Sequence, residues 1–390
     1  MAQKTEKHAN IRVEIDGKTA FETNTAGGTV DTFSGIHITR LHVDKRMDSP
    51  DMFTLDYDLI VRTGMTFVDS IVEGKAVKIQ IAYGPTSNLK PVFTGEISHV
   101  EPHFTNRGYS RLTISGYDRS HRLTRGTSMK SWDNRTTDAF DYTGIASDII
   151  QKSGNHDGSK LDGLAIGQTG NSESKFRHVP QLAVNNWQFL KSLGVDVGLK
   201  PGSENQDDKQ IGFRQVTVGA EKLTICRDKP DGTNPHIAHE VRFRLNTVKQ
   251  VSRVEVRGWN PQTKKNIVGV AESPSLSFGG TPGHEATAKA LYDGGPGKKF
   301  VVVDHPVYSK DEAKKVAQAL FDQLSMDFVT GEAEIEGDPE LAPGDVVAVL
   351  GFGKRFDGKY LVTACQHVYI PEVTPYVCRL ELSRNSINDA

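Results

Sequence analysis

The side chains best suited to hold a metal ion are thirteen histidines and three cysteines. His99 and His103 have the spacing of a helical ligand pair, but Pro102 and the strand-like sequence around it argue against a helix. His236 and His239 fall in an expected loop and lack an H-E-x-x-H frame. We therefore predict no metal site and no cofactor.

The cysteines are Cys226, Cys365 and Cys378, an odd and widely spaced set without a C-x-x-C pair. This spacing is not typical of a disulfide framework or of a zinc cluster. Cys365 and Cys378 each interrupt a strand-like run, so we interpret them as small buried hydrophobic residues.

Paired carboxylates would serve a cell-wall glycosidase, one as general acid and the other as base or nucleophile. The candidates all lie in expected turns, where an acidic side chain usually caps backbone N–H groups: Asp338, Glu340, Asp345 and Asp357. Neither a G-x-S-x-G nor a Cys/His catalytic signature occurs. The sequence thus predicts no catalytic residue and no enzyme.

Glycine-rich stretches could suggest a phosphate-binding loop. Gly351, Gly353 and Gly358 do not fit G-x-G-x-x-G, and a strand instead of a helix is expected after them. Residues 279–284 and 294–299 fail the P-loop pattern and are predicted to be flexible loops. We predict no cofactor-binding residue.

The charge of the chain is nearly balanced, with 47 basic and 49 acidic residues and a formal net charge of -2. This excludes a global attraction to nucleic acid or to an anionic membrane. The first strand-rich region is locally basic, and some of its arginines could line a channel for DNA or an effector: Arg40, Arg46, Arg107, Arg111, Arg119, Arg122 and Arg125.

The first ten residues lack an apolar secretory core, and no stretch approaches the roughly 18 apolar residues that span a bilayer. We expect folding in a reducing cytoplasm and no stable membrane insertion.

These residues must be positioned by a mainly β fold with α+β insertions. Alternation of apolar and polar residues predicts strand-rich regions that form a barrel or a sandwich, and helical spacing predicts smaller α/β domains between them. For the whole chain we expect two tube-like antiparallel β-barrel domains plus smaller α/β domains. The expected divisions are a first barrel at 11–118, a small α/β domain at 119–210, a second barrel at 211–260 and 329–385, and an α/β insertion with a loop and helix at 261–328.

The small α/β domain is expected to hold two helices, near residues 143–153 and 181–193. Thr143 is the predicted N-cap of the first. The polar run 201–209 has the composition of an exposed tip.

The clearest helix is predicted from Ser309 to about Phe328. Ser309 and Glu312 form a capping box, in which each side chain satisfies a backbone donor. An apolar stripe then has the right period for packing on a sheet: Val316, Leu320 and Leu324.

Three groups of motifs follow one another along the chain. The most specific lies near the C-terminus, where VTGEA (329–333) precedes GDPELAPGD (337–345) and FDGKYLVT (356–363). In the Pro-Gly turn, Gly344 is expected to take a positive φ. Earlier come GYDR (116–119) with His121 and Leu123, and Gln181 with NW (186–187) and FLK (189–191). Together they resemble the late control D proteins of contractile phages and, through them, the hub part of type VI secretion VgrG spike proteins.

This resemblance spans nearly the whole chain and implies a structural baseplate hub. In that family the hub is a homotrimer, whose two barrels per subunit adapt a three-fold spike to the six-fold tail tube. The implied partners are a central spike protein, a tail tube or tube-initiator protein, and baseplate wedge proteins. The lumen could carry a tape measure protein, DNA or an effector. Because the chain stops at Ala390, soon after the last expected strand, we expect the spike to be a separate protein. Such a protein is made in the bacterial cytoplasm and incorporated into a virion tail or an injection-particle baseplate.

Two other functions stay open. A tail-associated peptidoglycan hydrolase would need a catalytic carboxylate or a Cys/His dyad in a cleft. A carbohydrate-binding baseplate module would need clustered exposed aromatic residues, whereas Trp132, Trp187 and Trp259 are scattered along the sequence.

Overall fold

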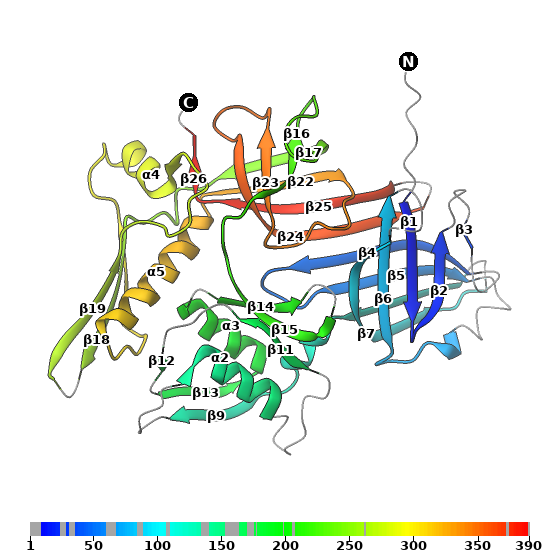
Figure 1. Cartoon of the computed structure of the whole chain (residues 1–390), viewed down its shortest axis with the longest axis horizontal. Helices are drawn as coiled ribbons and strands as arrows, with labels where there is room; N and C mark the ends of the chain where they lie inside the picture. Colours follow the sequence, from blue (N-terminus) through cyan, green and yellow to red (C-terminus); the bar gives the residue numbers. More distant parts are fainter. Residues whose placement is uncertain are drawn as a thin grey trace.

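A computed structural model describes most of the chain (Figure 1). The described residues are 9–23, 29–30, 36–59, 68–83, 89–106, 110–133, 140–152, 164–169, 175–176, 178–197, 199–204, 207–260, 263–371 and 374–388. Most of the elements in the described ranges are strands, and helices are fewer. The mainly β fold with smaller α/β parts is as predicted.

The N-terminal part is one antiparallel sheet, coloured blue to cyan in Figure 1. Its order is β4-β5-β8-β7-β6-β1-β2-β3. Residues of one parity face inward, as the alternation predicts: in β5, Phe53, Leu55 and Tyr57 are buried. The strands are β1 (Ala9–Ile15), β2 (Lys18–Thr23), β3 (Thr29–Val30), β4 (Ile36–Arg46), β5 (Met52–Leu59), β6 (Ala76–Tyr83), β7 (Lys90–His103) and β8 (Ser110–Tyr117).

The C-terminal strands form a closed six-stranded barrel, in the order β23-β16-β17-β22-β25-β24 and back to β23. We predicted antiparallel strands throughout, but β16 runs parallel to both β17 and β23. The barrel strands are β16 (Glu221–Cys226), β17 (Pro235–Leu245), β22 (Val329–Glu336), β23 (Val346–Leu350), β24 (Gly358–Ile370) and β25 (Thr374–Arg384). The short strands β20 (Thr281–Pro282) and β26 (Ser386–Ile387) pair beside it.

The barrel and the N-terminal sheet are continuous, because β24 also pairs with β4. We predicted that the N-terminal strands close into a barrel. Among the described residues no pairing joins β3 back to β4, so these strands form an open sheet. One hydrophobic core runs through both parts and contains Val43 and Phe53 as well as Tyr376 and Leu380. The two β parts therefore have a fixed relative orientation.

The small α/β part packs around its own core, below the barrel in Figure 1. Its helix α2 begins after Asp141, whose Oδ1 accepts the N–H of Gly144 at 2.6 Å, so Thr143 is not the N-cap. The predicted polar tip at 201–209 instead contributes to a hairpin, because strand pairing satisfies the backbone of a polar segment. The elements are η2 (Arg119–Thr124), β9 (Ser128–Asp133), β10 (Phe140–Asp141), α2 (Tyr142–Ser147), the π-helical turn η3 (Asp148–Lys152), β11 (Ala165–Thr169), β12 (Lys175–Phe176), β13 (His178–Val184), α3 (Asn186–Val197), β14 (Leu199–Glu204) and β15 (Asp207–Gln215).

The last part is the helix α5 (Lys310–Met326) on a three-stranded sheet. The sheet contains β18 (Arg253–Asn260), β19 (Lys265–Ala271) and β21 (Lys299–Val302), and α4 (Gly283–Leu291) lies nearby in the sequence. The expected division places 253–260 in the second barrel, but β18 pairs with β19 and β21 instead.

The Ser309 cap of α5 is confirmed, but the return bond of Glu312 goes to the N–H of Tyr308 instead of that of Ser309. Ser309 Oγ accepts the N–H of Glu312 at 3.1 Å, and Glu312 Oε2 accepts the N–H of Tyr308 at 2.7 Å. The predicted stripe packs into the core of this sheet, with Val316 buried and Leu320 and Leu324 partly buried.

Candidate functional site

A cluster of polar side chains lies inside the barrel, where β24 and β25 run antiparallel. Cys365 and His367 are two residues apart on β24 and so point to the same face. The strand register places Cys378 of β25 directly opposite His367. Tyr376 lies two residues before Cys378 and points the same way. We call these four residues the thiol–imidazole cluster; all four are buried.

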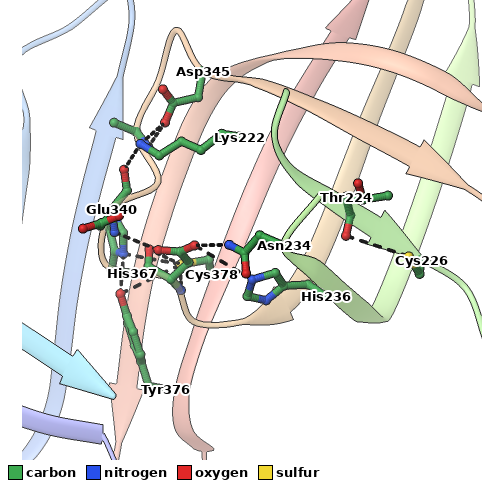
Figure 2. Close-up of polar contacts among 12 residues, drawn as sticks. Lys222, Thr224, Cys226, Asn234, His236, Glu340, Asp345, His367, Tyr376 and Cys378 are labelled. Carbon is green, nitrogen blue, oxygen red and sulfur yellow. Dashed lines mark hydrogen bonds and ion pairs between the residues drawn. The ribbon is translucent and has the colours of Figure 1, made fainter. Parts of the chain in front are cut away.

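The distances in this cluster are those of direct contacts. His367 Nε2 lies 3.5 Å from Cys365 Sγ, and His367 Nδ1 lies 3.4 Å from Cys378 Sγ. Tyr376 Oη is 2.8 Å from His367 Nδ1. The backbone N–H of Asp338 donates to Cys378 Sγ at 3.3 Å. Figure 2 shows His367, Tyr376 and Cys378 turned toward one another between the two strands.

The two thiols differ in acidity. Burial, followed by the hydrogen bond with Cys378, raises the pKa of Cys365 well above its usual value. Burial also opposes ionisation of Cys378, but the hydrogen bond with Cys365, the adjacent His367 and the Asp338 N–H together lower its pKa well below the usual value.

We predicted that the cysteines are buried, but we did not predict that Cys365 and Cys378 contact a histidine. Cys226 is also buried, and its sulfur contacts the backbone of Asp231, away from the cluster. The sequence signal that could have found the cluster is the alternating Cys-x-His of β24. It becomes informative only when the hairpin register brings Cys378 opposite His367.

The other histidines weighed as ligands do not form a cluster of three ligating groups among the described residues. His99 and His103 lie on strand β7, as Pro102 indicated. His236 and His239 are on β17 and not in a loop. Their rings approach carboxylates of the barrel, with His236 Nε2 3.8 Å from Asp338 and His239 Nδ1 3.7 Å from Glu334.

The turn carboxylates act mainly as backbone caps. Asp338 Oδ1 accepts the N–H of Glu340 at 2.9 Å, and Asp357 Oδ1 accepts the N–H of Phe352 at 2.8 Å. Asp345 Oδ2 accepts the N–H of Ala342 at 2.8 Å.

Two of these turn residues also form ion pairs with lysines. Asp345 Oδ2 lies 3.0 Å from Lys222 Nζ, a contact drawn in Figure 2. The carboxylate of Glu340 lies 3.0 Å from Lys90 Nζ. Both contacts tie the turn to neighbouring strands.

A different pair of carboxylates, which no sequence motif indicated, lies side by side. Glu332 of β22 and Glu381 of β25 are register partners and line one surface cavity. Two carboxylates on adjacent strands are the kind of groups that a glycosidase uses. However, Arg46 Nη2 lies 2.8 Å from Glu381 Oε1, and Arg242 is the register partner of Glu332. This favours a network of surface ion pairs.

The arginines considered as a channel lining are mostly matched with acidic groups. Arg40 pairs with Asp56 at 2.8 Å, and Arg111 with Asp58 at 3.4 Å. Arg107 lies outside the described residues. The remaining arginines of the set contact Glu96, Asp44 or Glu381, or the ring of His121: Arg46, Arg119, Arg122 and Arg125.

The glycine-rich segments act as turns. Gly351, Gly353 and Gly358 all have positive φ, and β24 follows as expected. Residues 279–282 lead into α4, and 294–298 connect α4 to β21.

The three tryptophans lie in different places. Trp132 and Trp187 are buried in the small α/β part, and Trp259 is exposed on β18. They form no shared aromatic surface.

Among the described residues no helix is long and apolar enough to cross a membrane.

Comparison with known proteins gives one family match and several structural neighbours. A family model described as the Alg8 N-terminal domain matches residues 236–370, less than half of the chain. No curated protein matches the sequence.

The structural neighbours match over nearly the full length. The 43 kDa tail protein of prophage MuSo2 from Shewanella oneidensis has a TM-score of 0.67 at 12% identity, covering 97% of this chain and 100% of that one. The tail protein from Neisseria meningitidis MC58 has a TM-score of 0.64 at 14% identity, covering 97% of each chain. The E. coli c3393 protein, described as a component of the type VI secretion system, has a TM-score of 0.56 at 10% identity, covering 97% of this chain and 79% of that one. The chain therefore has the fold of prophage tail proteins and of a type VI secretion component.

Proposed function

We propose that the chain is a structural baseplate hub of a contractile phage tail, a tailocin or a phage-like injection system, and that it belongs to the late control D family. The observation that carries this proposal is the fold, which the chain shares along 97% of its length with a prophage tail protein. The ordered motifs of the sequence support the same family.

In this proposal three copies form a ring that joins a central spike to the six-fold tail tube. Each copy contributes two β parts, the N-terminal sheet and the C-terminal barrel, so that a trimer presents six. An adaptor of this kind must hold its two parts at a constant angle. The pairing of β4 with β24, from Leu41 opposite Tyr369 to Arg46 opposite Ala364, provides a continuous hydrogen-bonded connection instead of a flexible linker.

In the part of the chain that the structure describes, β3 at the edge of the N-terminal sheet has no further strand partner, and this supports association with other chains. A sheet edge presents unpaired N–H and C=O groups, which tend to find a partner strand. In the proposed assembly the partners are the other two subunits, the spike, the tube or tube-initiator protein, and the baseplate wedge proteins. The lumen could hold a tape measure protein, DNA or an effector.

We propose a structural role without enzymatic activity. The barrel carboxylates at the turns cap backbone groups, and Glu381 is paired with Arg46. The proposed domain division keeps the first β domain at 11–118 and extends the small α/β domain from 119–210 to Gln215, because β15 pairs with β11 and β14. We assign 253–260 to the α/β insertion, since β18 pairs there.

The test is the mass of the assembly in solution, measured by light scattering with and without the co-expressed spike protein. We expect a complex with three copies of this chain in at least one of the two samples. A stable monomer in both would contradict the proposal.

A further inference from the structure

We propose that Cys365, His367 and Cys378 form a binding site for one divalent metal ion of the zinc class. This site is independent of the proposed hub function. The three ligand atoms all lie within 4.8 Å of one another. They come from two strands of the barrel, so an ion bound there would cross-link β24 to β25.

The distances suit tetrahedral coordination. With Zn–S bonds of about 2.3 Å and Zn–N bonds of about 2.0–2.1 Å, a tetrahedral centre places sulfur and nitrogen ligands about 3.5 Å apart. Cys365 Sγ and His367 Nε2 are separated by 3.5 Å. Cys378 Sγ lies 3.4 Å from Nδ1 of the same ring, so it would have to move toward the Nε2 side to complete the set of three ligands.

The neighbours of the three ligands are those that metal sites use. A ligating histidine usually donates its other ring N–H to an oxygen, which fixes the tautomer and the orientation of the ring. Tyr376 Oη, 2.8 Å from His367 Nδ1, is suited to accept that proton and leaves Nε2 for the metal. The Asp338 N–H, 3.3 Å from Cys378 Sγ, would stabilise the thiolate.

A fourth ligand would have to come from an oxygen next to the cluster. The carbonyl oxygen of Asp338 lies 3.6 Å from Cys378 Sγ, in the wall of the buried site. Tyr376 Oη does not serve as this ligand, because it accepts the Nδ1–H of His367.

Charge balance selects the class of ion. Two thiolates and a neutral imidazole carry two negative charges, which a divalent cation neutralises. A monovalent ion would leave one negative charge in a buried site, at a large cost in solvation. Soft sulfur ligands together with imidazole favour zinc over magnesium or calcium.

The experiment uses the full chain, purified under reducing conditions and titrated with Co²⁺ as a spectroscopic substitute for Zn²⁺. We expect one equivalent of Co²⁺ to produce a thiolate-to-cobalt charge-transfer band, and Zn²⁺ to abolish it by displacement. The variants Cys365→Ser and Cys378→Ser should lose the band. Cys226→Ser is the matched control, since Cys226 is equally buried but far from the cluster, and it should keep the band.

A second measurement on the unaltered protein avoids the risk that a variant does not fold. In mild urea, Zn²⁺ should slow alkylation of Cys365 and Cys378 by about tenfold or more while leaving Cys226 unchanged, because bound thiolates are not free to react. The proposal is overturned by the absence of a charge-transfer band in the folded protein, by a band that survives Cys365→Ser, or by equal alkylation of all three cysteines. An intact mass that shows a Cys365–Cys378 disulfide in protein purified under reducing conditions would also overturn it.

Discussion

Val43 of the N-terminal sheet and His367 of the barrel are register partners across β4 and β24. On its other side β24 pairs with β25, where His367 is opposite Cys378. One strand therefore belongs to both β parts and also carries Cys365 and His367, two of the four residues of the thiol–imidazole cluster. A change in β24 should affect the barrel, the cluster and the angle between the two β parts together.

The turn before β23 gives the first prediction. Gly344 has φ +95°, as expected from the Pro-Gly sequence, and its N–H donates to the carbonyl of Val362 at 2.8 Å. Gly344→Val should cost about 1–3 kcal/mol of unfolding free energy as local strain. It should also reduce the number of full-length tails, because the register of β23 in the barrel would be disturbed. Urea unfolding and negative-stain counts in a complemented deletion strain measure the two effects.

The control for this prediction is Gly219→Val. At Gly219 an added Cβ would meet no heavy atom within 4 Å, and the backbone does not have a positive φ. This variant should leave both stability and tail number near those of the unaltered protein. Normal tail numbers with Gly344→Val would show that the turn is tolerant.

The second prediction concerns Arg384, which is buried at the end of β25. Its guanidinium donates to the carbonyl of Asp357 at 2.8 Å and to Asn388 Oδ1 at 2.9 Å, and it packs over the ring of Tyr360. Arg384→Leu should lower the unfolding free energy by about 1.5–3 kcal/mol for each charged hydrogen bond that is lost. Arg384→Lys should rescue little, since an ammonium cannot reproduce the planar set of donors. Unfolding curves of Arg384→Lys that match the unaltered protein would contradict this role.

The third prediction is a dependence on pH. Burial acts to raise the pKa of Glu96, but the hydrogen bond from Arg122 and the charges of Arg122, His121 and Arg119 outweigh it, so the pKa is lowered. A carboxyl with a lowered folded-state pKa stabilises the fold above its unfolded pKa of about 4.3 and loses that contribution as the pH falls further. Glu96→Gln should therefore cost about 2 kcal/mol at pH 7. The difference from the unaltered protein should shrink as the pH falls below about 4. A difference that is constant between neutral and acidic pH, by urea unfolding, would rule this out.

Local patterns predicted most of the strands, the cap of α5 and the positive φ of Gly344. They did not predict which strands pair at long range. Nothing in the alternation of residues 36–46 indicates that β4 lies beside β24, far along the chain. For the same reason β18 was grouped with the wrong sheet, and the parallel position of β16 was missed. The thiol–imidazole cluster was missed because the register between β24 and β25, which brings Cys378 opposite His367, cannot be read from the local pattern of either strand.

The fourth prediction tests the hydrolase alternative at Glu332 and Glu381, the register partners in the surface cavity. The purified chain should not clear a suspension of cell wall, and Glu332→Gln should behave in the same way. A lysozyme sample serves as the positive control. Clearing by the unaltered chain that disappears in Glu332→Gln would establish an enzyme and contradict the structural role.

The position of this chain in an assembled particle decides most directly whether it is a hub. Electron cryo-microscopy of intact tails or injection particles from a producing strain, with the chain fitted to the density, gives that position. We predict three copies around the particle axis, between the spike and the first ring of the tube, each with its β4–β24 connection intact. Density for the chain elsewhere in the particle, or its absence from assembled particles, would contradict the proposed function.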